Sequence, residues 1–143
     1  MQAKDIMTPN VECISPGMDL VETAKKMKSL DVGFIPLCEA DRLVGTVTDR
    51  DIVVRAVAED NDMRETTAGD IMTSEAFWCY DDQSVEEVSE FMAEKEIRRV
   101  LVLDRNKRLV GVISIGDIAK AGEQTKAGES LKEIAEAPRS EAA

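Results

Sequence analysis

The sequence repeats itself with a period of about 65 residues, and this feature limits the possible folds most. The segment GTVTDRDI at 45–52 returns as GVISIGDI at 111–118, and RLV precedes both copies. AKDIMT at 3–8 likewise returns as AGDIMT at 68–73. Self-similarity at a fixed period is typical of chains built from equivalent structural units. The sequence therefore predicts two copies of one fold.

Each copy predicts the same order of elements, β-α-β-β-α. A short strand leads to an amphipathic helix, which opens with a capping box at Asp19 with Glu22 in one copy and at Ser84 with Glu87 in the other. Two apolar runs joined by a short turn then predict a hairpin, and a second helix follows. The predicted strands are 10–15, 33–39, 42–48, 75–80, 98–104 and 108–114, and the predicted second helices are 51–60 and 117–124.

One copy alone would bury too little apolar surface to be stable, so we expect the two copies to pack sheet to sheet around one core. The predicted fold class is α/β in the broad sense, α+β by its antiparallel pairs. We expect a first repeat, a polar linker, a second repeat, and a tail with a short helix that opens at a capping box of Ser130 with Glu133. These divisions are 1–60, 61–67, 68–122 and 123–143.

Composition argues against several function classes. The net charge of −11 would repel a phosphate backbone, so we expect no nucleic-acid partner. The absence of histidine removes the commonest general base and the commonest metal ligand, so we expect neither a metal site nor an enzyme. No signal peptide or long apolar run is visible, so we expect a cytoplasmic protein that does not enter a membrane. The three cysteines, in apolar runs without CxxC spacing, are interpreted as reduced core thiols.

The repeated motif Gly-x-x-[Ser/Thr]-x-x-Asp allows two interpretations. Thr48 with Asp51, and Ser114 with Asp117, have the spacing of a capping box, so both pairs can simply start helices. Alternatively, a short carboxylate at a helix start can accept two hydrogen bonds from a ribose diol, with the hydroxyl close to a phosphate. Two observations favour the ribose clamp: the other predicted boxes of the two repeats use Glu, and a glycine lies within each preceding strand, at Gly45 and Gly111. One residue can also do both.

The DIMT segments, the capped helices, and the runs VGFIPLCEADRLVGTVTDRDI and IRRVLVLDRNKRLVGVISIGDI resemble tandem cystathionine-β-synthase (CBS) domains, the pair called a Bateman module. The resemblance covers residues 1 to about 122. It implies two clefts between the repeats in which adenine nucleotides bind. It also implies that the hydroxyl and carboxylate of the motif contact phosphate and ribose, and that apolar residues such as those of the Ile35–Pro36 segment hold the base.

The resemblance further implies that basic residues of the strand before the hairpin turn reach phosphate. Arg98 and Arg99 match these positions in the second copy, whereas the first copy has Gly33 and Phe34. Strand alternation sends neighbouring side chains to opposite faces, so only one of the two arginines can easily face a given cleft, and we take Arg99 as the weaker candidate. We therefore expect a strong site at Ser114 and Asp117 and a weak one at Thr48 and Asp51.

The sequence thus predicts a non-catalytic regulatory module that binds AMP, ADP, ATP or another adenosyl compound and needs no cofactor. The alternative is a ligand-free dimerisation or scaffold module whose motif residues only cap helices. The second helix of the first copy, DIVVRAVA, has more apolar residues than one buried face needs, and the resemblance implies pairing through such helices. We expect a homodimer, with an unidentified partner protein as a further possible recipient of the signal.

Overall fold

The protein, described by a computed structural model over residues 1–122, forms two compact units. Within the described residues, unit 1 comprises Met1–Val11 together with residues 77–122, and unit 2 comprises Glu12–Ala76. The predicted helix at Ser130 lies outside the described residues. No helix within residues 1–122 is long and apolar enough to cross a membrane.

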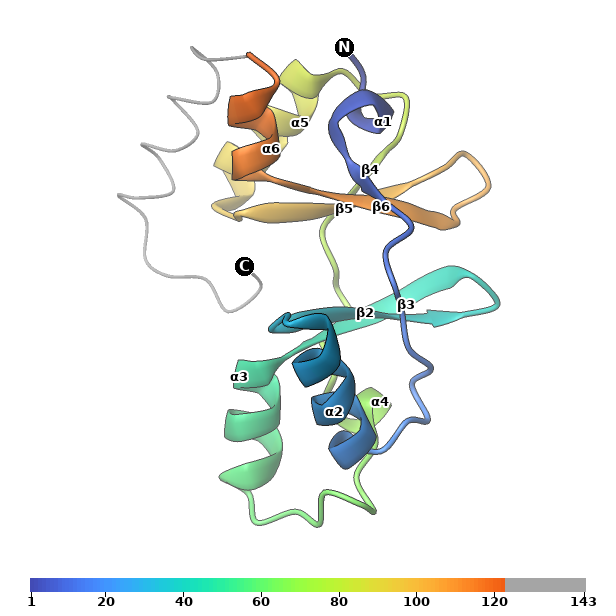
Figure 1. Cartoon of the computed structure of the whole chain (residues 1–143), viewed down its shortest axis with the longest axis vertical. Helices are drawn as coiled ribbons and strands as arrows, with labels where there is room; N and C mark the ends of the chain where they lie inside the picture. The colour runs from blue at the N-terminus through green and yellow to red at the C-terminus, as the bar shows by residue number, and fades with distance from the viewer. Residues whose placement is uncertain (123–143) are drawn as a thin grey trace. The chain divides into compact units, whose positions relative to one another are not determined.

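Unit 1 is a four-stranded sheet with helices against one face (Figure 1). The strand order is β1-β6-β5-β4, in which β4 runs parallel to β5 and the other pairs are antiparallel. Val100 and Val102 of β5 pack with Val88 and Met92 of a helix in the core of this unit. The elements are α1 (Ala3–Ile6), β1 (Thr8–Pro9), β4 (Trp78–Tyr80), α5 (Val85–Lys95), β5 (Arg99–Leu103), β6 (Leu109–Ser114) and α6 (Ile115–Lys120).

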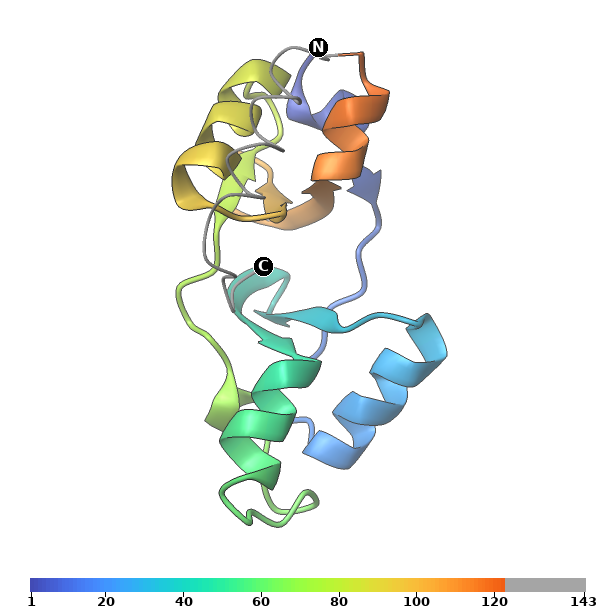
Figure 2. The same ribbon diagram turned by 90° about the vertical axis from the view of Figure 1, so that its left-hand side faces the viewer.

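Unit 2 repeats this arrangement around a two-stranded sheet. Its predicted hairpin forms, and Ala40 and Asp41 at its turn have positive φ angles of 50° and 64°, as a two-residue type I′ turn requires. Figure 2 shows the second helix continuing as one coil through a π-helical turn, beside the first helix. The elements are α2 (Leu20–Leu30), β2 (Phe34–Glu39), β3 (Arg42–Thr48), α3 (Asp49–Ile52), the π-helix η1 (Val53–Val57) and α4 (Ala68–Ile71).

The two units exchange their first segments, which the sequence did not predict. The AKDIMT segment of the first repeat supplies α1 and β1 to unit 1, where Thr8 pairs with Val112 of β6. The AGDIMT segment of the second repeat supplies α4 to unit 2, where Thr73 and Thr46 of β3 exchange two backbone hydrogen bonds of 2.9 Å. Each compact unit therefore combines the first segment of one repeat with the body of the other.

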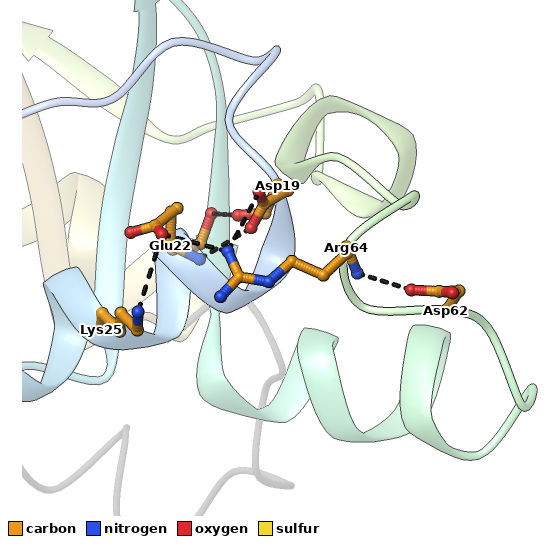
Figure 3. A network of polar contacts seen from close by, with 6 residues as sticks. Asp19, Glu22, Lys25, Asp62 and Arg64 are labelled. Carbon is orange, nitrogen blue, oxygen red and sulfur yellow. Dashed lines mark hydrogen bonds and ion pairs between the residues drawn. The ribbon is translucent and has the colours of Figure 1, made fainter.

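The predicted linker is docked onto the start of α2. Arg64 Nη1 donates to Glu22 Oε1 at 3.1 Å and lies 3.6 Å from Asp19 Oδ2, as Figure 3 shows. The backbone N–H of Leu20 donates to the carbonyls of Met63 and Thr66, both at 3.0 Å. Because Asp19 caps α2 and Arg64 contacts its carboxylate, this polar segment helps to fix the N-terminus of the helix.

Two predictions about the segment 10–15 are wrong. It does not form a strand of several residues: Asn10 has a positive φ of 56°, and Ile14 alone makes a bridge, parallel to Leu37 of β2. The chain passes from unit 1 to unit 2 between Val11 and Glu12, so the segment joins the two units and pairs with β2 only at Ile14. The prediction that Cys13 is a core thiol is also wrong: Cys13 is exposed, although the neighbouring Ile14 is buried, whereas Cys38 and Cys79 are buried as predicted.

Candidate functional site

The two repeated motifs form reciprocal capping boxes at the ends of the hairpins. In unit 2 the Asp51 N–H donates to Thr48 Oγ1 at 3.0 Å, and the Thr48 N–H donates to Asp51 Oδ2 at 2.9 Å. In unit 1 the Asp117 N–H donates to Ser114 Oγ at 3.2 Å, and the Ser114 N–H donates to Asp117 Oδ2 at 2.8 Å. The helix-capping interpretation is therefore satisfied at both motifs.

Aspartate in a capping box is not confined to these motifs. Thr67 and Asp70 form a reciprocal box at the start of α4, with hydrogen bonds of 2.9 and 3.2 Å. Asp5 accepts a hydrogen bond from the Gln2 N–H in the same way at 2.8 Å. Short helices outside the two motifs thus also use Asp rather than Glu in the capping box. The use of Asp in the motifs therefore does not by itself favour a ribose clamp.

The two motifs differ in what surrounds the carboxylate. Asp51 is 5% exposed, and its Oδ1 lies 3.7 Å from Arg55 Nε. Arg55 Nη1 also donates to the carbonyls of Ile71 at 3.2 Å and Met72 at 3.4 Å, so it ties η1 to the end of α4. The corresponding position in unit 1 is Ala121, and Asp117 is only half-buried. Asp51 therefore has a structural ion pair that Asp117 cannot form with the equivalent residue.

Only unit 1 has the basic residues predicted at the site, Arg98 and Arg99. The β5–β6 register places Arg99 opposite Ser114, and side chains opposite each other in an antiparallel pair share a face. The weaker candidate, Arg99, is thus the one that the register puts next to the motif hydroxyl, while Arg98 is exposed and its carbonyl accepts the Ile115 N–H at 3.0 Å.

In unit 2, Phe34 occupies the position opposite Thr48, and an acidic side chain lies beside Gly33. A Cβ on Gly33 would lie 2.8 Å from Asp49 Oδ2, so the aspartate fills the space where unit 1 has the Cβ of Arg98. Asp49 corresponds to the apolar Ile115. The motif of unit 2 therefore contains two carboxylates, Asp49 and Asp51, and the motif of unit 1 contains one, Asp117, a difference that the prediction of unequal sites had not used.

The structure accounts for the two motif glycines without a ligand. A Cβ on Gly111 would lie 2.5 Å from Met7 Sδ and 2.9 Å from the Thr8 carbonyl oxygen. A Cβ on Gly45 would lie 2.7 Å from Met72 Sδ and 2.9 Å from the Thr73 carbonyl oxygen. The close approach expected at these glycines is thus made by the exchanged segments.

The predicted base-binding segment lies within β2. Ile35 is 1% exposed and packs in the core with Leu37 and Val47, so its side chain is occupied. Pro36 alternates to the other face of the strand and pairs with Thr46. In unit 1, Phe77 packs against the core. Its ring makes an edge-to-face contact with Phe91, and the ring centroids are 6.3 Å apart.

The described residues place no group of three or more Cys, His, Asp or Glu side chains where they could hold a metal ion. Each unit therefore has its own candidate site, a hydroxyl and a carboxylate at the end of its hairpin, and unit 1 adds an arginine opposite the hydroxyl. This is the arrangement of a tandem-repeat α/β module whose two halves each present a hydroxyl–carboxylate pair. The family model for the CBS domain matches residues 3–58 and 68–123, and the chain belongs to this family.

Known proteins agree with this assignment. The CBS domain-containing protein YhcV of Bacillus subtilis is 39% identical over 116 residues, which is 81% of each chain. The crystal structure of Hypoxic Response Protein I with two coordinated zinc ions matches with a TM-score of 0.76 and 35% identity, over 85% of this chain and 98% of that one. The CBS domain pair of protein MJ0100, in complex with 5′-methylthioadenosine and S-adenosyl-L-methionine, matches with a TM-score of 0.71 and 25% identity, over 87% and 98%.

Proposed function

We propose that the protein is a non-catalytic, cytoplasmic regulatory module that binds an adenosyl ligand and reports it through conformation or association. The ligand is an adenine nucleotide or an S-adenosyl compound. The observation that carries the proposal is the Ser114–Asp117 pair of unit 1. Its carboxylate has no counterpart of Arg55 beside it, and Arg99 lies opposite Ser114 in the β5–β6 pair. The structure of the MJ0100 domain pair with two adenosyl compounds supports this ligand class.

The proposed roles follow from the hydrogen bonds that the Ser114 hydroxyl and the Asp117 carboxylate can make in addition to those of the capping box. Asp117 Oδ2 accepts the Ser114 N–H, which leaves Oδ1 to accept hydrogen bonds from the ribose diol. The Ser114 hydroxyl has a donor proton for a phosphate or carboxylate oxygen while its oxygen accepts the Asp117 N–H. Arg99 and Arg98 supply positive charge for phosphate. Pro36 is the proposed apolar contact of the adenine in the weaker site of unit 2, since the Ile35 side chain is taken up in the core.

A thermal-shift screen tests the proposal. AMP, ADP, ATP, NAD, adenosine, 5′-methylthioadenosine and S-adenosylmethionine would each be added to the purified chain, with GTP as the control. A ligand that binds only the folded state stabilises it by about 2.7 kcal/mol at a concentration of 100 times its Kd. The melting temperature therefore rises with ligand concentration. We expect at least one adenosyl compound to do so and GTP to be weaker. The proposal fails if no adenosyl compound shifts the melting temperature and mass spectrometry finds none copurified.

The capping boxes favour a second candidate, a ligand-free dimerisation or scaffold module. The Thr67–Asp70 box has the same residue pair at the start of a helix outside both motifs, which supports this candidate. A flat thermal-shift screen, together with a stable dimer, is the result expected of this candidate. Turnover of a bound nucleotide would contradict both candidates, because each is non-catalytic.

Replacing Arg98 and Arg99 together with alanine should weaken phosphorylated ligands far more than adenosine. Guanidinium groups bind phosphate through charge-assisted hydrogen bonds, each worth roughly 1.5–3 kcal/mol, and adenosine has no phosphate to lose. Titration calorimetry with AMP and adenosine measures the difference. The matched control replaces Arg105 and Arg108 at the far end of the same hairpin, with the same change in net charge. If both double variants lose the same affinity for AMP, the effect is due to net charge, and a direct contact of Arg98 or Arg99 with phosphate is contradicted.

We also propose that the module forms a homodimer through the helices of unit 2. Val53, Val54 and Val57 are 57%, 44% and 56% exposed on one continuous coil. Beside them lies an open apolar groove of about 370 Å³ between α2 and η1. Exposed apolar residues next to an apolar groove are typical of an association surface. The groove is lined by Leu20, Val21, Ala24, Lys25, Lys28, Ile52, Val57 and Met63.

The double substitution Val53→Glu and Val57→Glu should convert the dimer to a monomer. Both side chains are exposed within a helix, so glutamate leaves the fold intact but places four like charges in a symmetric interface. Sedimentation equilibrium should give twice the chain mass of 15.7 kDa for the parent and 15.7 kDa for the variant. Val32→Glu, an exposed valine outside these helices, is the control and should stay dimeric. A parent chain that is monomeric at tens of micromolar would contradict the proposal.

A further inference from the structure

Asp51 of unit 2 is almost completely enclosed, although its counterpart in unit 1, Asp117, is not. Asp51 is 5% exposed, whereas Asp117 is half-buried. Both residues form the same capping box, in which Oδ2 accepts the backbone N–H of Thr48 at 2.9 Å or of Ser114 at 2.8 Å. Because the boxes are alike, the difference in exposure must come from the side chains around the other carboxylate oxygen, Oδ1.

Arg55 lies beside this second oxygen of Asp51 and is held there at two points. Its Nε is 3.7 Å from Asp51 Oδ1, and its Nη1 donates to the carbonyls of Ile71 at 3.2 Å and Met72 at 3.4 Å. These carbonyls lie at the C-terminal end of α4, where the last carbonyls have no partner within the helix and the helix dipole is negative. The guanidinium is thus fixed between a carboxylate and a helix end, next to the oxygen that a ribose diol would need.

The equivalent position of unit 1 is built differently. Ala121 takes the place of Arg55 in the repeat, and α6 ends there, with Ala121 as its C-cap. In unit 2 the coil instead continues through η1, where the Ala58 N–H donates to the Val53 carbonyl at 2.9 Å, five residues earlier. Such π-helical turns are rare and frequently occur at functional positions. Arg55 and the turn that contains it therefore distinguish unit 2 from unit 1.

We propose that Arg55 is a specificity-determining residue that keeps the adenosyl site of unit 2 closed, and that this site, once opened, takes uncharged adenosyl compounds. The inference rests on the proposed function, because it concerns the same motif. A ribose diol can donate to Asp51 Oδ1 only if it reaches the carboxylate, and at 5% exposure, with the guanidinium in place, the carboxylate is covered. A ligand would have to displace Arg55 from Asp51 and from the end of α4 together.

The surroundings of the motif define which ligands the opened site would accept. Phe34 lies opposite Thr48, where unit 1 has Arg99 opposite Ser114. Asp49 adds a carboxylate, whose Oδ1 accepts the backbone N–H of the next residue at 2.8 Å. Both differences disfavour a phosphate group. Adenosine and 5′-methylthioadenosine have a ribose diol and no phosphate, so they fit this site better than AMP or ATP.

Carboxylate labelling tests the cover on Asp51 without any ligand. The folded chain would be treated with a water-soluble carbodiimide and an amine, digested and analysed by mass spectrometry. We expect Asp51 to be labelled several-fold less than Asp117 in the parent, and to about the same extent as Asp117 in Arg55→Ala. Arg64→Ala is the matched control and should keep Asp51 protected, because Arg64 pairs with a different carboxylate of unit 2, Asp19, at 3.6 Å.

Two further measurements separate uncovering from unfolding. The Arg55 side chain is 44% exposed and alanine favours helix, so Arg55→Ala should stay folded. Cys38, which is buried in the same unit, should then remain unreactive towards an alkylating agent. Arg55→Gln can still donate to the α4 carbonyls but has no charge to pair with Asp51, and it should raise the labelling of Asp51 in the same way.

Titration calorimetry with adenosine as the probe then counts the sites. We expect one site per chain in the parent, two in Arg55→Ala, and one again in Arg55→Ala combined with Asp51→Asn. AMP should bind the new site more weakly than adenosine does.

Three results would overturn the proposal. The first is an Asp51 that is labelled as readily as Asp117 in the parent, and the second is an Arg55→Ala chain in which labelling does not rise. The third is labelling that rises without a second adenosine site, because unit 2 would then be uncovered but would not bind the ligand class. The proposed function fails separately, if the parent binds no adenosyl compound, and a site gained in Arg55→Ala would still support the role of Arg55.

Discussion

Asp117→Asn should reduce the affinity for the adenosyl ligand by roughly 1.5–3 kcal/mol, about ten- to more than a hundredfold, while stability changes by about 1 kcal/mol or less. The asparagine carbonyl can still accept the Ser114 N–H, which Asp117 Oδ2 accepts at 2.8 Å, so the cap survives. The second carboxylate oxygen is replaced by an amide NH₂, which donates and cannot accept from a ribose diol. Titration calorimetry and thermal unfolding on the same variant measure both quantities.

Asp70→Asn is the matched control for this prediction. Asp70 sits in a reciprocal box of the same geometry with Thr67 but without any basic residue predicted as a phosphate ligand. It should cost a similar amount of stability and leave ligand affinity unchanged. If Asp117→Asn also leaves affinity unchanged, Asp117 is only a helix cap and the ribose clamp is wrong.

Gly111→Ala should destabilise the fold by about 3 kcal/mol, the upper part of the range for overpacking. The new Cβ would lie 2.5 Å from Met7 Sδ and 2.9 Å from the Thr8 carbonyl oxygen. The methionine side chain can move, but Thr8 belongs to β1, which is paired with β6 at this point. The substitution therefore pushes the exchanged N-terminal segment off the sheet of unit 1. Urea unfolding curves measure the loss.

Two further variants isolate the cause. Gly116→Ala places a Cβ no closer than 3.6 Å to Ser114 Oγ, within helix α6, so it should be neutral or stabilising by up to about 1 kcal/mol. In a Met7→Ala background, which lacks the sulfur contact but keeps the contact with the Thr8 carbonyl, Gly111→Ala should cost less than in the parent chain but still be destabilising. A Gly111→Ala chain as stable as the parent would mean that the exchanged segment does not hold this position.

Most of the fold could be predicted because its signals are local. The hairpins follow from apolar runs separated by short turns, and the long helices follow from apolar periodicity behind a capping residue. Asp19 and Ser84 accept the N–H groups of Glu22 and Glu87 at 2.8 and 3.1 Å, as predicted. The CBS family assignment is confirmed by the match of its model to both repeats.

The segment exchange could not be predicted because it joins residues about a hundred positions apart, such as Thr8 with Val112. No local pattern records that pairing. One signal was present and was interpreted differently: a glycine within each strand indicated a close neighbour, and the neighbour is a methionine and a carbonyl of the exchanged segment.

The sequence predicts which residues form the candidate site, but it does not predict which side chains surround them. The pairs Thr48–Asp51 and Ser114–Asp117 were found from spacing alone, and the inequality of the two arginine positions was visible in the sequence. The ion pair of Asp51 with Arg55 and the place of Asp49 beside Gly33 depend on side-chain packing, which spacing does not fix. Both differences make unit 2 the less favourable place for a phosphate, because they add a carboxylate there and engage a guanidinium.

The most direct test of the account is calorimetric titration of the parent chain with the adenosyl compound that gives the largest thermal shift. The account predicts one strong site per chain, retained in Asp51→Asn and lost in Asp117→Asn. Two equal sites, or a strong site that is lost only in Asp51→Asn, would contradict it.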